Sequence, residues 1–551
     1  MWGIDLGTTN TGIARWNDAD ESPQMVDLPK ISRRAGQTLQ RDDGFMIPSA
    51  VEAFEHLDFW GRFGRWGPIS RRFFVGKQAL IGWEAIKENQ TKPKSSYAKS
   101  FKRQLAQDPH QTIARLGNRA LSARNMARLF IRELLGEVKK TTGEYVRELT
   151  FTTPVDSYET YRAELATIAK SAGVREVHFL DEPVAAAVGY GLSLHKSQNV
   201  LVVDFGGGTL DLALVNLDPR DVEEGQCRVL AKAGRPIGGE LVDRWIVEAM
   251  SEKLKFRNIH EFPEYWHKLM RAEACRVKES LFLKPEEVFV PVPPRLNEPL
   301  LEDAIRFTKD DLVALIEKRG VHEILEECTI EILRQAEQEL NVQVDEVLMV
   351  GGSTLLPGVY AQFENRFGRE KVRAWQPFEA VVLGAGVFAA GKMQQLDFIV
   401  HDYAFVTHDM DTHEAEHSII IPRGTRFPTK PDFWKRQVVP TCSLGEPEKI
   451  FKLVISEIGQ NHGGGQRYIW DAQGELHKMG EGAEEQAPVV VPLNDKNPTL
   501  GILNPPHHPR DKSSRLDIAF GVNADRWLCA TVFDLHTKKH LMQDEPVVRL
   551  V

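Results

Sequence analysis

The sequence predicts an α/β region over residues 1–392, followed by an all-β module over residues 401–551. Three observations support this division. Apolar runs that end in glycine-rich turns predict the strands of an α/β fold. Stretches of helical periodicity separate these runs, and at Met393 they give way to short alternating runs with turn residues. A chain of 551 residues is also too long for a single core, so two or more domains are expected.

Composition limits the possible functions. The hydrophobic content of 42% and the charged content of 27% are ordinary for a soluble globular protein. The net charge of −9 argues against a nucleic-acid partner, which would need clustered positive charge. Five widely spaced cysteines without a CxxC pair predict neither a zinc site nor a disulfide framework, and they fit a reducing compartment. The start has no signal-peptide pattern and no run approaches about 20 apolar residues, so we expect a cytoplasmic protein without a membrane partner.

The stretch Leu201–Asp211 has an apolar run that ends in Asp204, followed by three glycines, Thr209 and a second apolar run. This pattern predicts two strands joined by a tight turn. Glycines let the backbone approach a ligand closely and direct several N–H groups toward one anion, such as phosphate. Asp204 and Asp211 could hold a hydrated metal cation against phosphate oxygens. On its own, the stretch fits a glycine-rich hairpin with two solvated aspartates equally well.

The stretch Trp2–Ala14 has the same design. Its apolar run reaches Asp5, and Gly7–Asn10 follow as a polar turn. Hydroxyl groups beside a glycine turn add O–H donors to the N–H donors that can bind phosphate. Two such hairpins in one chain suggest a duplicated half-domain, in which each half supplies one phosphate loop.

The other elements of the α/β region follow from periodicity and breaker residues. Glu182 stands at a strand end just before a helix, a position suited to catalysis, although a structural acid near a helix N-terminus is the alternative. The expected elements are a helix over Met126–Val138, a strand over Leu149–Thr153, a helix from Asp156 to Gly173, a strand over Val177–Phe179, a helix over Ala185–Tyr190, helices between Leu241 and Leu283, a strand with a third glycine pair over Val347–Gly352, and a helix over Phe378–Gly386.

Residues 50–110 are rich in aromatic side chains and arginines, with five basic residues and no acid from Arg62 to Lys77. This stretch could be a docking patch, but we favour arginines that snorkel around a small satellite core. Lys102 follows in a pattern typical of a surface lysine. In the all-β module, the strand signals are Ser418–Thr425, Lys452–Ile455, Arg515–Phe520 and Trp527–Phe533, and mobile loops are expected at Gly463–Gly465 and Gly474–Glu485.

These motifs, in this order, resemble the seventy-kilodalton heat-shock chaperone family of the DnaK type. The resemblance implies an α/β actin-like two-lobed ATPase domain, with a nucleotide in the cleft between the lobes, followed by an all-β substrate-binding domain. The matching segments are Gly3–Asn10 (first phosphate loop), Asp204–Asp211 (second phosphate loop), Val350–Thr354 (adenosine motif), Asp181–Tyr190, Ile237–Glu240, and, for the peptide-binding β-domain, Ile420–Lys430 and Arg515–Asp525 with the strand through Phe533.

The resemblance also implies ligands and residue roles. The ligands are ATP or ADP with Mg²⁺, and K⁺ is a further candidate ion. Asp5 and Asp204 would hold Mg²⁺ and its waters, Thr209 would lie near the γ-phosphate, Lys102 would neutralise it, and Glu182 would orient water. The resemblance implies that Asp204 is also a catalytic residue, together with Lys102, Glu182 and Thr209. The remaining nucleotide contacts that it implies are Gly7, Thr8, Thr9, Asn10, Gly206, Gly207, Gly208, Gly238, Gly239, Glu240, Glu273, Arg276, Ser280, Gly351, Gly352 and Ser353.

The chain departs from the family pattern around the base. Val277, Leu355 and Phe378 stand where relatives have a second basic residue, an arginine and an aspartate. Apolar side chains in place of cations would weaken or reshape adenine recognition. The linker over residues 393–400 keeps the family's Asp-and-leucine pattern only in part. No helical periodicity follows the last strand, so we expect no helical lid and rapid release of peptide.

The resemblance implies a chaperone that hydrolyses ATP to ADP and phosphate and couples this to binding and release of extended polypeptide clients, in protein folding and the stress response. J-domain co-chaperones and nucleotide exchange factors are further candidate partners. The alternative is a nucleotide-dependent regulatory or assembly protein whose β-domain binds one dedicated partner. A sugar- or acetate-type kinase on the same fold is disfavoured by the β-module and linker, because a kinase needs a small-molecule acceptor site in the cleft.

Overall fold

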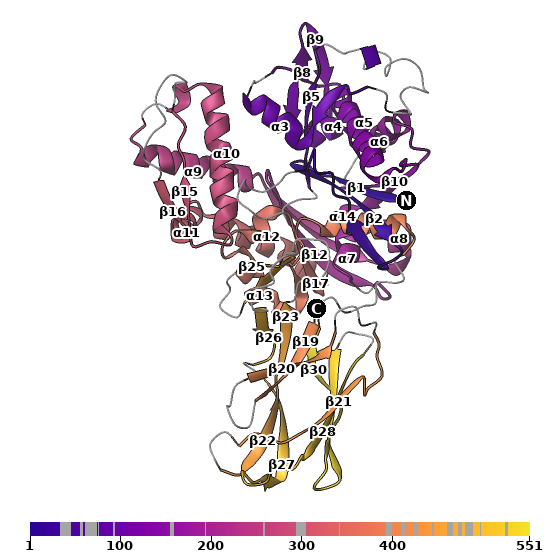
Figure 1. The fold of residues 1–551 in the computed structure, drawn as a ribbon, viewed down its shortest axis with the longest axis vertical. Coiled ribbons are helices and arrows are strands. Elements are labelled where there is room, and N and C mark those ends of the chain that lie inside the picture. Colours follow the sequence, from indigo (N-terminus) through magenta and orange to yellow (C-terminus); the bar gives the residue numbers. More distant parts are fainter. Residues whose placement is uncertain are drawn as a thin grey trace. The chain divides into compact units, whose positions relative to one another are not determined.

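A computed structural model gives the fold of the chain (Figure 1). It describes residues 1–32, 46–55, 59–60, 74, 76–91, 94–154, 159–192, 194–256, 259–293, 305–340, 342–392, 399, 402–408, 415–422, 425, 427–442, 446–459, 467–471, 476–479, 489–495, 498–523 and 527–550. These divide into an α/β unit, Met1–Phe367 with Val372–Gln394, and a β unit that contains Gln395–Gly463 and Arg467–Val551. The prediction of an α/β region followed by a β-rich region is confirmed at this level, and the domain boundaries stay a prediction.

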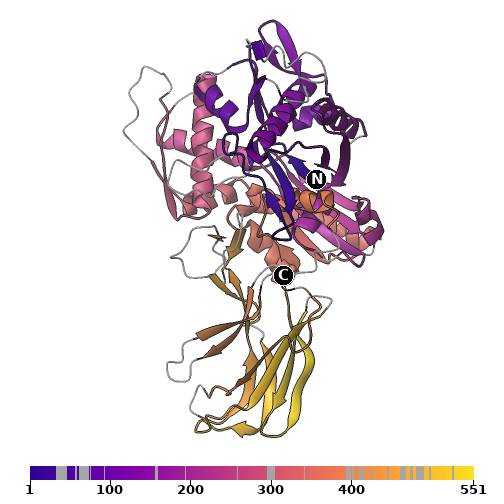
Figure 2. The same ribbon diagram turned by 45° about the vertical axis from the view of Figure 1, so that its right-hand side comes forward.

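Two sheets with the same strand order form the centre of the α/β unit (Figures 1 and 2). In each, an antiparallel hairpin continues into a third antiparallel strand on one side and two parallel strands on the other. This repeat agrees with a duplicated half-domain. The first sheet runs β11 (Glu176–Asp181), β10 (Glu148–Thr153), β1 (Trp2–Leu6), β2 (Asn10–Asn17) and β3 (Ser22–Met25), and β4 (Ile47–Pro48) pairs with β2; the second runs β14 (Arg228–Arg235), β13 (Leu210–Leu217), β12 (Gln198–Phe205), β17 (Glu346–Val350) and β18 (Val372–Arg373).

The helices cover these sheets and extend the unit. Helix α5 begins with a capping box between Ser122 and Asn125, which explains why it starts before the predicted Met126. The helices are α3 (Gly82–Thr91), α4 (Lys102–Gln107), α5 (Ala123–Thr142), α6 (Glu159–Ser171), α7 (Glu182–Gly189), α8 (Pro219–Glu223), α9 (Gly239–Lys253), α10 (Glu264–Leu281), α11 (Lys309–Lys318), α12 (Val321–Arg334), α13 (Val359–Phe367) and α14 (Ala380–Ala389), with a π-helix over Gln335–Leu340 and short 3₁₀ turns at Ile259–Glu261, Gly352–Leu355 and Arg369–Lys371.

Helices α7 and α14 pack closely against each other, and α14 also packs on β1, β2, β3 and β10. A side chain at Gly384 would collide with the backbone of Ala185, so the small residues of the predicted helix pair are needed for this contact. The smaller strands of the unit are β5 (Ala50–Ala53), β6 (Ala79–Ile81) and β7 (Tyr97–Lys99) in one sheet, and the pairs β8 (Thr112–Leu116) with β9 (Arg119–Ser122) and β15 (Glu286–Phe289) with β16 (Ile305–Thr308).

The β unit has its own apolar core, in which Phe405, Trp434 and Phe520 contact one another. Its strands form the sheets β20 (Ala415–Ile421), β19 (Asp402–His408), β23 (Ile455–Gly459), β26 (Val489–Pro492); β21 (Trp434–Val438), β28 (Leu516–Val522), β29 (Trp527–Asp534), β30 (Lys539–Arg549); and the pairs β22 (Glu448–Leu453) with β27 (Thr499–His507) and β24 (Arg467–Trp470) with β25 (Leu476–Met479).

Some predictions fall outside the described residues. These are the basic stretch from Arg62 to Lys77 except Phe74, Gly76 and Lys77, the linker over residues 393–400 except Ile399, the loop Gly463–Gly465, and most of Gly474–Glu485. Within the last stretch, Leu476–Met479 pair as strand β25 rather than forming a loop. In the part of the chain that the structure describes, no helix combines the length and apolarity needed to span a bilayer.

Candidate functional site: two facing loops and a lysine–glutamate pair

The first predicted loop is the turn between β1 and β2. Its backbone is fixed from one side, because Ser49 Oγ donates to Gly7 O at 2.7 Å and Ser49 N donates to Thr9 O at 2.9 Å. Asp5 ends the strand before the turn, and Thr152 Oγ1 on β10 donates to its Oδ1 at 2.6 Å. The C=O of one residue and the N–H of the next point in opposite directions across a trans peptide. The N–H of Thr8 therefore points away from Ser49.

The second predicted loop is the turn between β12 and β13, and its carbonyls are fixed in the same manner. Gly206 O accepts from Gly239 N at 3.1 Å and from Ser353 Oγ at 2.8 Å, and Gly207 O accepts from Glu240 N at 2.8 Å. By the same peptide geometry, the N–H groups of Gly207 and Gly208 point away from this backing segment. Consecutive N–H groups of this kind form a binding site for an anion.

The two loops face each other. A Cβ placed on Gly207 would lie 2.7 Å from Thr9 Oγ1, so only glycine allows this approach. The third glycine pair lies beside them, because Gly351, at φ +88°, brings its Cα next to Phe205 O and Asp204 Oδ1. The structure thus brings together the three glycine motifs that are separated in the sequence.

Lys102 and Glu182 form an ion pair within the α/β unit. Lys102 Nζ lies 2.7 Å from Glu182 Oε1, and the two side chains are only 12% and 23% exposed. Lys102 begins α4, and Glu182 begins α7 after β11. Arg162 on α6 donates to the preceding Asp181 at 2.8 Å and fixes the strand end that carries Glu182. Lys102 is therefore not a surface lysine.

The pKa shifts place these side chains within electrostatic range of one another. Burial, together with the carboxylates of Glu182 and Asp211, raises the pKa of Asp204 to about 8, and Lys102 opposes this rise. Burial also raises the pKa of Asp5, against Lys102 and the hydrogen bond from Thr152. Burial would lower the pKa of Lys102, but the carboxylates of Glu182 and Asp5 outweigh it and raise this pKa. Several buried carboxyl groups around one lysine favour a cation, because a cation would let them ionise.

The carboxyl groups of this site can be compared with the ligands that Mg²⁺ prefers. The described residues contain no group of three or more His, Cys, Asp or Glu side chains that could enclose a metal ion. Asp5 and Asp204 therefore fit a cation that arrives with its own phosphate and water ligands, as Mg²⁺ prefers, rather than one held by protein ligands alone.

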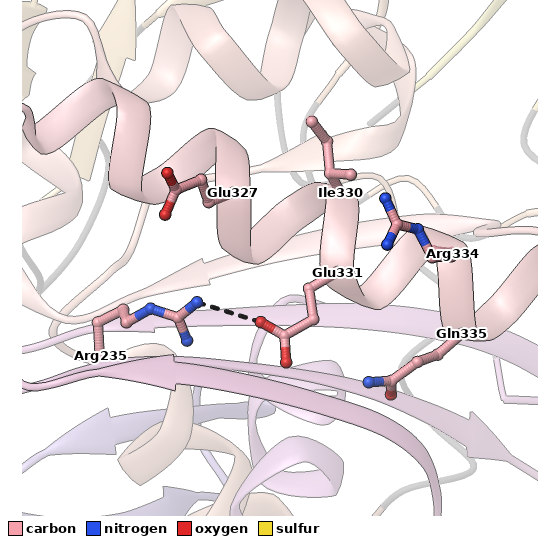
Figure 3. Close-up of a pocket in the computed structure, with 6 residues that line it drawn as sticks. All are labelled: Arg235, Glu327, Ile330, Glu331, Arg334 and Gln335. Carbon is pink, nitrogen blue, oxygen red and sulfur yellow. Dashed lines mark hydrogen bonds and ion pairs between the residues drawn. The ribbon is translucent and has the colours of Figure 1, made fainter.

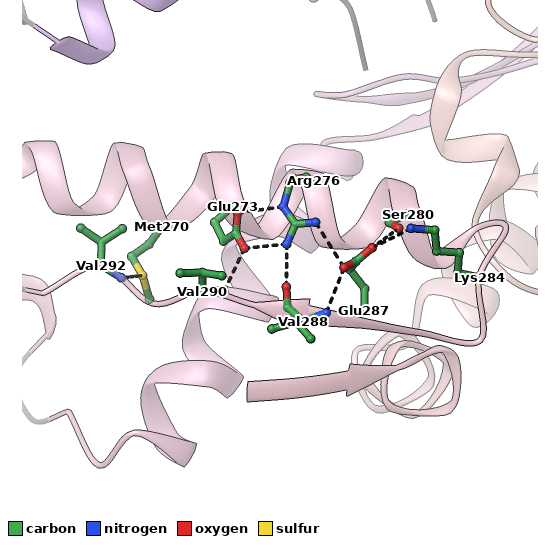
Figure 4. A network of polar contacts seen from close by, with 9 residues as sticks. All are labelled: Met270, Glu273, Arg276, Ser280, Lys284, Glu287, Val288, Val290 and Val292. Carbon is green, nitrogen blue, oxygen red and sulfur yellow. Dashed lines mark hydrogen bonds and ion pairs between the residues drawn. The ribbon is translucent and has the colours of Figure 1, made fainter. Parts of the chain in front are cut away.

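The three α10 residues predicted for the base pocket make contacts elsewhere (Figure 4). Arg276 Nε donates to Glu273 Oε2 at 2.9 Å, and its Nη2 donates to Val288 O at 2.6 Å. Ser280 Oγ donates to Glu287 Oε2, a bond that, with smaller contributions from Lys284 and the backbone, lowers the pKa of Glu287 to about 2. These contacts join α10 to β15 and its continuation, and do not bring the three residues to the loops. Their base-pocket role stays a prediction.

A different α10 residue reaches the loops. Lys278 is 6% exposed, and its Nζ donates to Gly239 O at 3.0 Å and lies 2.7 Å from Asp243 Oδ1. It lies two residues, or about 200° around the helix, from Arg276. Sequence reasoning missed Lys278, Asp243 and Thr152. The sequence of α10 does not show which face of the helix turns toward the loops, so Glu273 and Arg276 could not be distinguished from Lys278. The only sequence signal for Thr152 was its position in a predicted strand.

The apolar substitutions around the base pocket differ in placement. Val277 and Leu355 are buried, at 0% and 4% exposed. The ring of Phe378 packs on Gly352 so closely that a Cβ there would collide with it. Of the three apolar residues that differ from the family pattern, Phe378 is the one shown to pack directly on the third glycine motif.

A separate cavity of about 500 Å³ lies between the end of β14 and helix α12 (Figure 3). Arg235 and Glu331 face each other across it with 3.2 Å between Nη2 and Oε2. Glu327, Ile330, Arg334 and Gln335 complete its lining. None of the predicted site residues lines this cavity.

The model of the family described as Hsp70 protein matches residues 71–451, more than half of the chain. The chain belongs to the Hsp70 family. Its curated relatives include the protein named Chaperone protein DnaK from Thermotoga petrophila, 26% identical over 475 residues that cover 83% of this chain and 70% of the relative. The protein of the same name from Thermus thermophilus is 27% identical over 442 residues, or 78% of this chain and 67% of the relative. As a family, Hsp70 proteins are ATPases with actin-like lobes, so this Hsp70 chain has the family's nucleotide-binding fold.

Proposed function

We propose that this Hsp70 protein binds ATP with Mg²⁺ between its two loops and hydrolyses it to ADP and phosphate. The observation that carries the proposal is the approach of Thr9 to Gly207, with the Lys102–Glu182 pair in electrostatic range of both loop aspartates. Phosphoryl transfer needs positioned donors and positive charge more than covalent chemistry. The loop N–H groups, whose direction the hydrogen-bonded carbonyls fix, supply the donors, and Lys102 supplies the positive charge.

Each residue has a role in this proposal. The N–H groups of Thr8, Gly207 and Gly208, with the hydroxyl of Thr9, bind the phosphates. Asp5 and Asp204 would hold Mg²⁺ through its waters, and the ion would supply positive charge to the phosphates. Lys102 stabilises the charge that develops on the transferred phosphoryl group. Glu182, oriented by Lys102, positions the attacking water, and Thr209 lies beside the terminal phosphate. Gly7, Asn10, Gly206, Gly238, Glu240, Gly351, Gly352 and Ser353 complete the loops and their support.

We further propose that the β unit binds extended polypeptide segments and that nucleotide state controls their release. The family membership and the printed name of the DnaK relatives support this. Strand edges and apolar pockets of a β-rich domain suit extended peptides. J-domain proteins and nucleotide exchange factors are proposed partners. The alternative remains one dedicated partner, and a peptide-array screen separates the two, because broad binding to apolar peptides supports a chaperone and binding to none supports the alternative.

The nucleotide proposal is tested by calorimetric titration of the full chain with ADP and GDP, with and without Mg²⁺. We expect binding of ADP that strengthens with Mg²⁺; absence of ADP binding would refute the site. Single-turnover hydrolysis then tests the catalytic roles. Thr209→Ala and Glu182→Ala should each slow hydrolysis by about 100-fold with nearly unchanged ADP affinity. Hydrolysis at the wild-type rate in both variants would refute these two assignments.

A further inference from the structure

A buried tyrosine near the Lys102–Glu182 pair carries a hydroxyl without a hydrogen-bond partner. Tyr161, on α6, is 1% exposed, and its hydroxyl oxygen forms no hydrogen bond with any residue that the structure describes. An unpaired buried hydroxyl costs free energy that a phenylalanine at the same position would avoid. Such a group is completed by a water or a ligand, or it belongs to a catalytic site.

Helix α6 packs on both elements that lead to the pair. It contacts α4, which begins with Lys102, and β11, whose end leads into Glu182. Arg162, the residue after Tyr161, donates to Asp181 Oδ1 at 2.8 Å and fixes this part of α6 to the strand end before Glu182. The backbone that carries Tyr161 is therefore held close to the pair.

The charges of the site act on the phenol of Tyr161. Burial, together with the carboxylates of Glu182 and Asp5, raises the pKa of Tyr161 to about 12, and Lys102 opposes this rise. Tyr161 in turn contributes to the raised pKa of Lys102. These reciprocal effects place the phenol within electrostatic range of the three charged groups. At neutral pH the phenol keeps its proton and can donate a hydrogen bond.

We propose that the hydroxyl of Tyr161, together with Glu182, holds the water that attacks the terminal phosphate of ATP. Lys102 Nζ lies 2.7 Å from Glu182 Oε1, which leaves the other carboxylate oxygen to accept from the water. Tyr161 donates to one lone pair of the water oxygen, and the second lone pair faces the terminal phosphorus. This inference rests on the proposed ATPase site and adds a residue to it.

The hydroxyl of Tyr161 orients the water without exchanging a proton with it. The water oxygen forms a bond to the terminal phosphorus as the bond from this phosphorus to the bridging oxygen breaks, and that electron pair leaves with ADP. One water proton passes to an oxygen of the released phosphate, which leaves as H₂PO₄⁻. The other proton stays on the transferred oxygen and is hydrogen-bonded to Glu182. Tyr161 contributes alignment of the reacting atoms.

The variant Tyr161→Phe removes only the hydroxyl, and single-turnover ATP hydrolysis by the full chain measures the effect. We expect a rate about tenfold below wild type, because one hydrogen bond to the reacting water is lost. Calorimetric ADP affinity should change less than about twofold. The melting temperature should not fall, because the hydroxyl has no partner among the described residues. Tyr360→Phe, at a buried tyrosine on α13, is the matched control and should hydrolyse ATP at the wild-type rate.

The Glu182→Ala background tests whether the two residues hold the same water. In this background, Tyr161→Phe should slow hydrolysis by less than about a further twofold, because the water has already lost its orientation. A further loss of about tenfold would overturn the proposal, since Tyr161 would then act independently of Glu182.

Three other results would overturn the proposal. A wild-type rate in Tyr161→Phe would leave the phenol a core side chain, and equal losses of rate and ADP affinity would place it in nucleotide binding. A lower melting temperature would give the hydroxyl a structural role. If Glu182→Ala remains slow while Tyr161→Phe is as fast as wild type, only this inference fails. If the wild-type chain binds no ADP, the proposed function itself is refuted, and this inference with it.

Discussion

The two phosphate loops occupy equivalent turns of two sheets with the same topology, yet they are supported differently. Ser49 supports the first loop through both its hydroxyl and its backbone N–H, which donate to Gly7 O and Thr9 O, and the hydroxyl of Thr152 donates to Asp5. Backbone N–H groups and Ser353 support the second, with the Lys278–Asp243 pair behind them. Asp204 lies opposite Asp211 in the hairpin, and burial with nearby carboxylates raises its pKa to about 8.

This difference assigns different electrostatic tasks to the two aspartates. Burial raises the pKa of Asp5 as well, but the hydrogen bond from Thr152 and the charge of Lys102 both favour its ionised form. Asp204 remains largely protonated at neutral pH until a cation arrives. The first loop is therefore the preformed half of the site, and the second is the half that responds to ligand charge. Four measurements can break or sharpen this contrast.

The largest effect is expected for the lysine shared by both loops. Lys102→Met removes the cation that offsets Asp5, Glu182 and Asp204, and single-turnover ATP hydrolysis should fall by about 100- to 1,000-fold. Arg103→Met, an exposed neighbour on α4, is the matched control and should retain wild-type rates. Loss of activity in both variants, or in neither, would contradict a specific role for Lys102.

The next effect concerns support of the first loop. Thr152→Val removes the hydrogen bond to Asp5 and should weaken Mg²⁺-dependent ADP binding by about tenfold, because a hydrogen bond to a charged group is lost. Thr153→Val is the control, since its buried Oγ1 has no hydrogen-bond partner among the described residues. If Thr153→Val weakened binding equally, the preformed character of Asp5 would not depend on Thr152.

Proton release should distinguish the two aspartates. At pH 7, binding of Mg²⁺ with ADP requires ionised Asp204, whose pKa near 8 keeps the free carboxyl mostly protonated. Calorimetry in buffers of different ionisation enthalpy should therefore show release of about one proton. Asp204→Asn should abolish most of this release, whereas Asp5→Asn should leave most of it. Equal contributions from both variants would remove the contrast between the loops.

The smallest expected effect is on stability without nucleotide. Folded Asp204 binds a proton up to about pH 8, whereas the unfolded side chain loses its proton near pH 3.9, so this group makes the folded state less stable as pH rises between these values. The melting temperature of Asp204→Asn relative to wild type should therefore rise by a few degrees from pH 5 to pH 8. A constant difference across this range would show that the carboxyl of Asp204 titrates normally.

Local patterns were sufficient for much of the fold and for the loops. Each loop is a contiguous run, and the requirements of a tight turn and close approach can be read from Gly7, Gly207 and Gly351 without knowledge of their neighbours. Periodicity predicted the helix that became α5, and runs of small residues predicted the helices that became α7 and α14; the observed helices differ from these predictions at their ends.

The sequence by itself therefore determined which segments could bind phosphate, since glycine, threonine and aspartate have intrinsic backbone and donor properties. Only the tertiary structure decided the partners that support those segments. Lys102 meets Glu182 across 80 residues, and Thr152 meets Asp5 across 147. On α10, a shift of two residues turns a side chain to the opposite face, so Lys278 rather than Arg276 reaches the loop. The physical reason is that a pair of charges acquires its strength from the burial that folding imposes on it, and no local pattern specifies that burial.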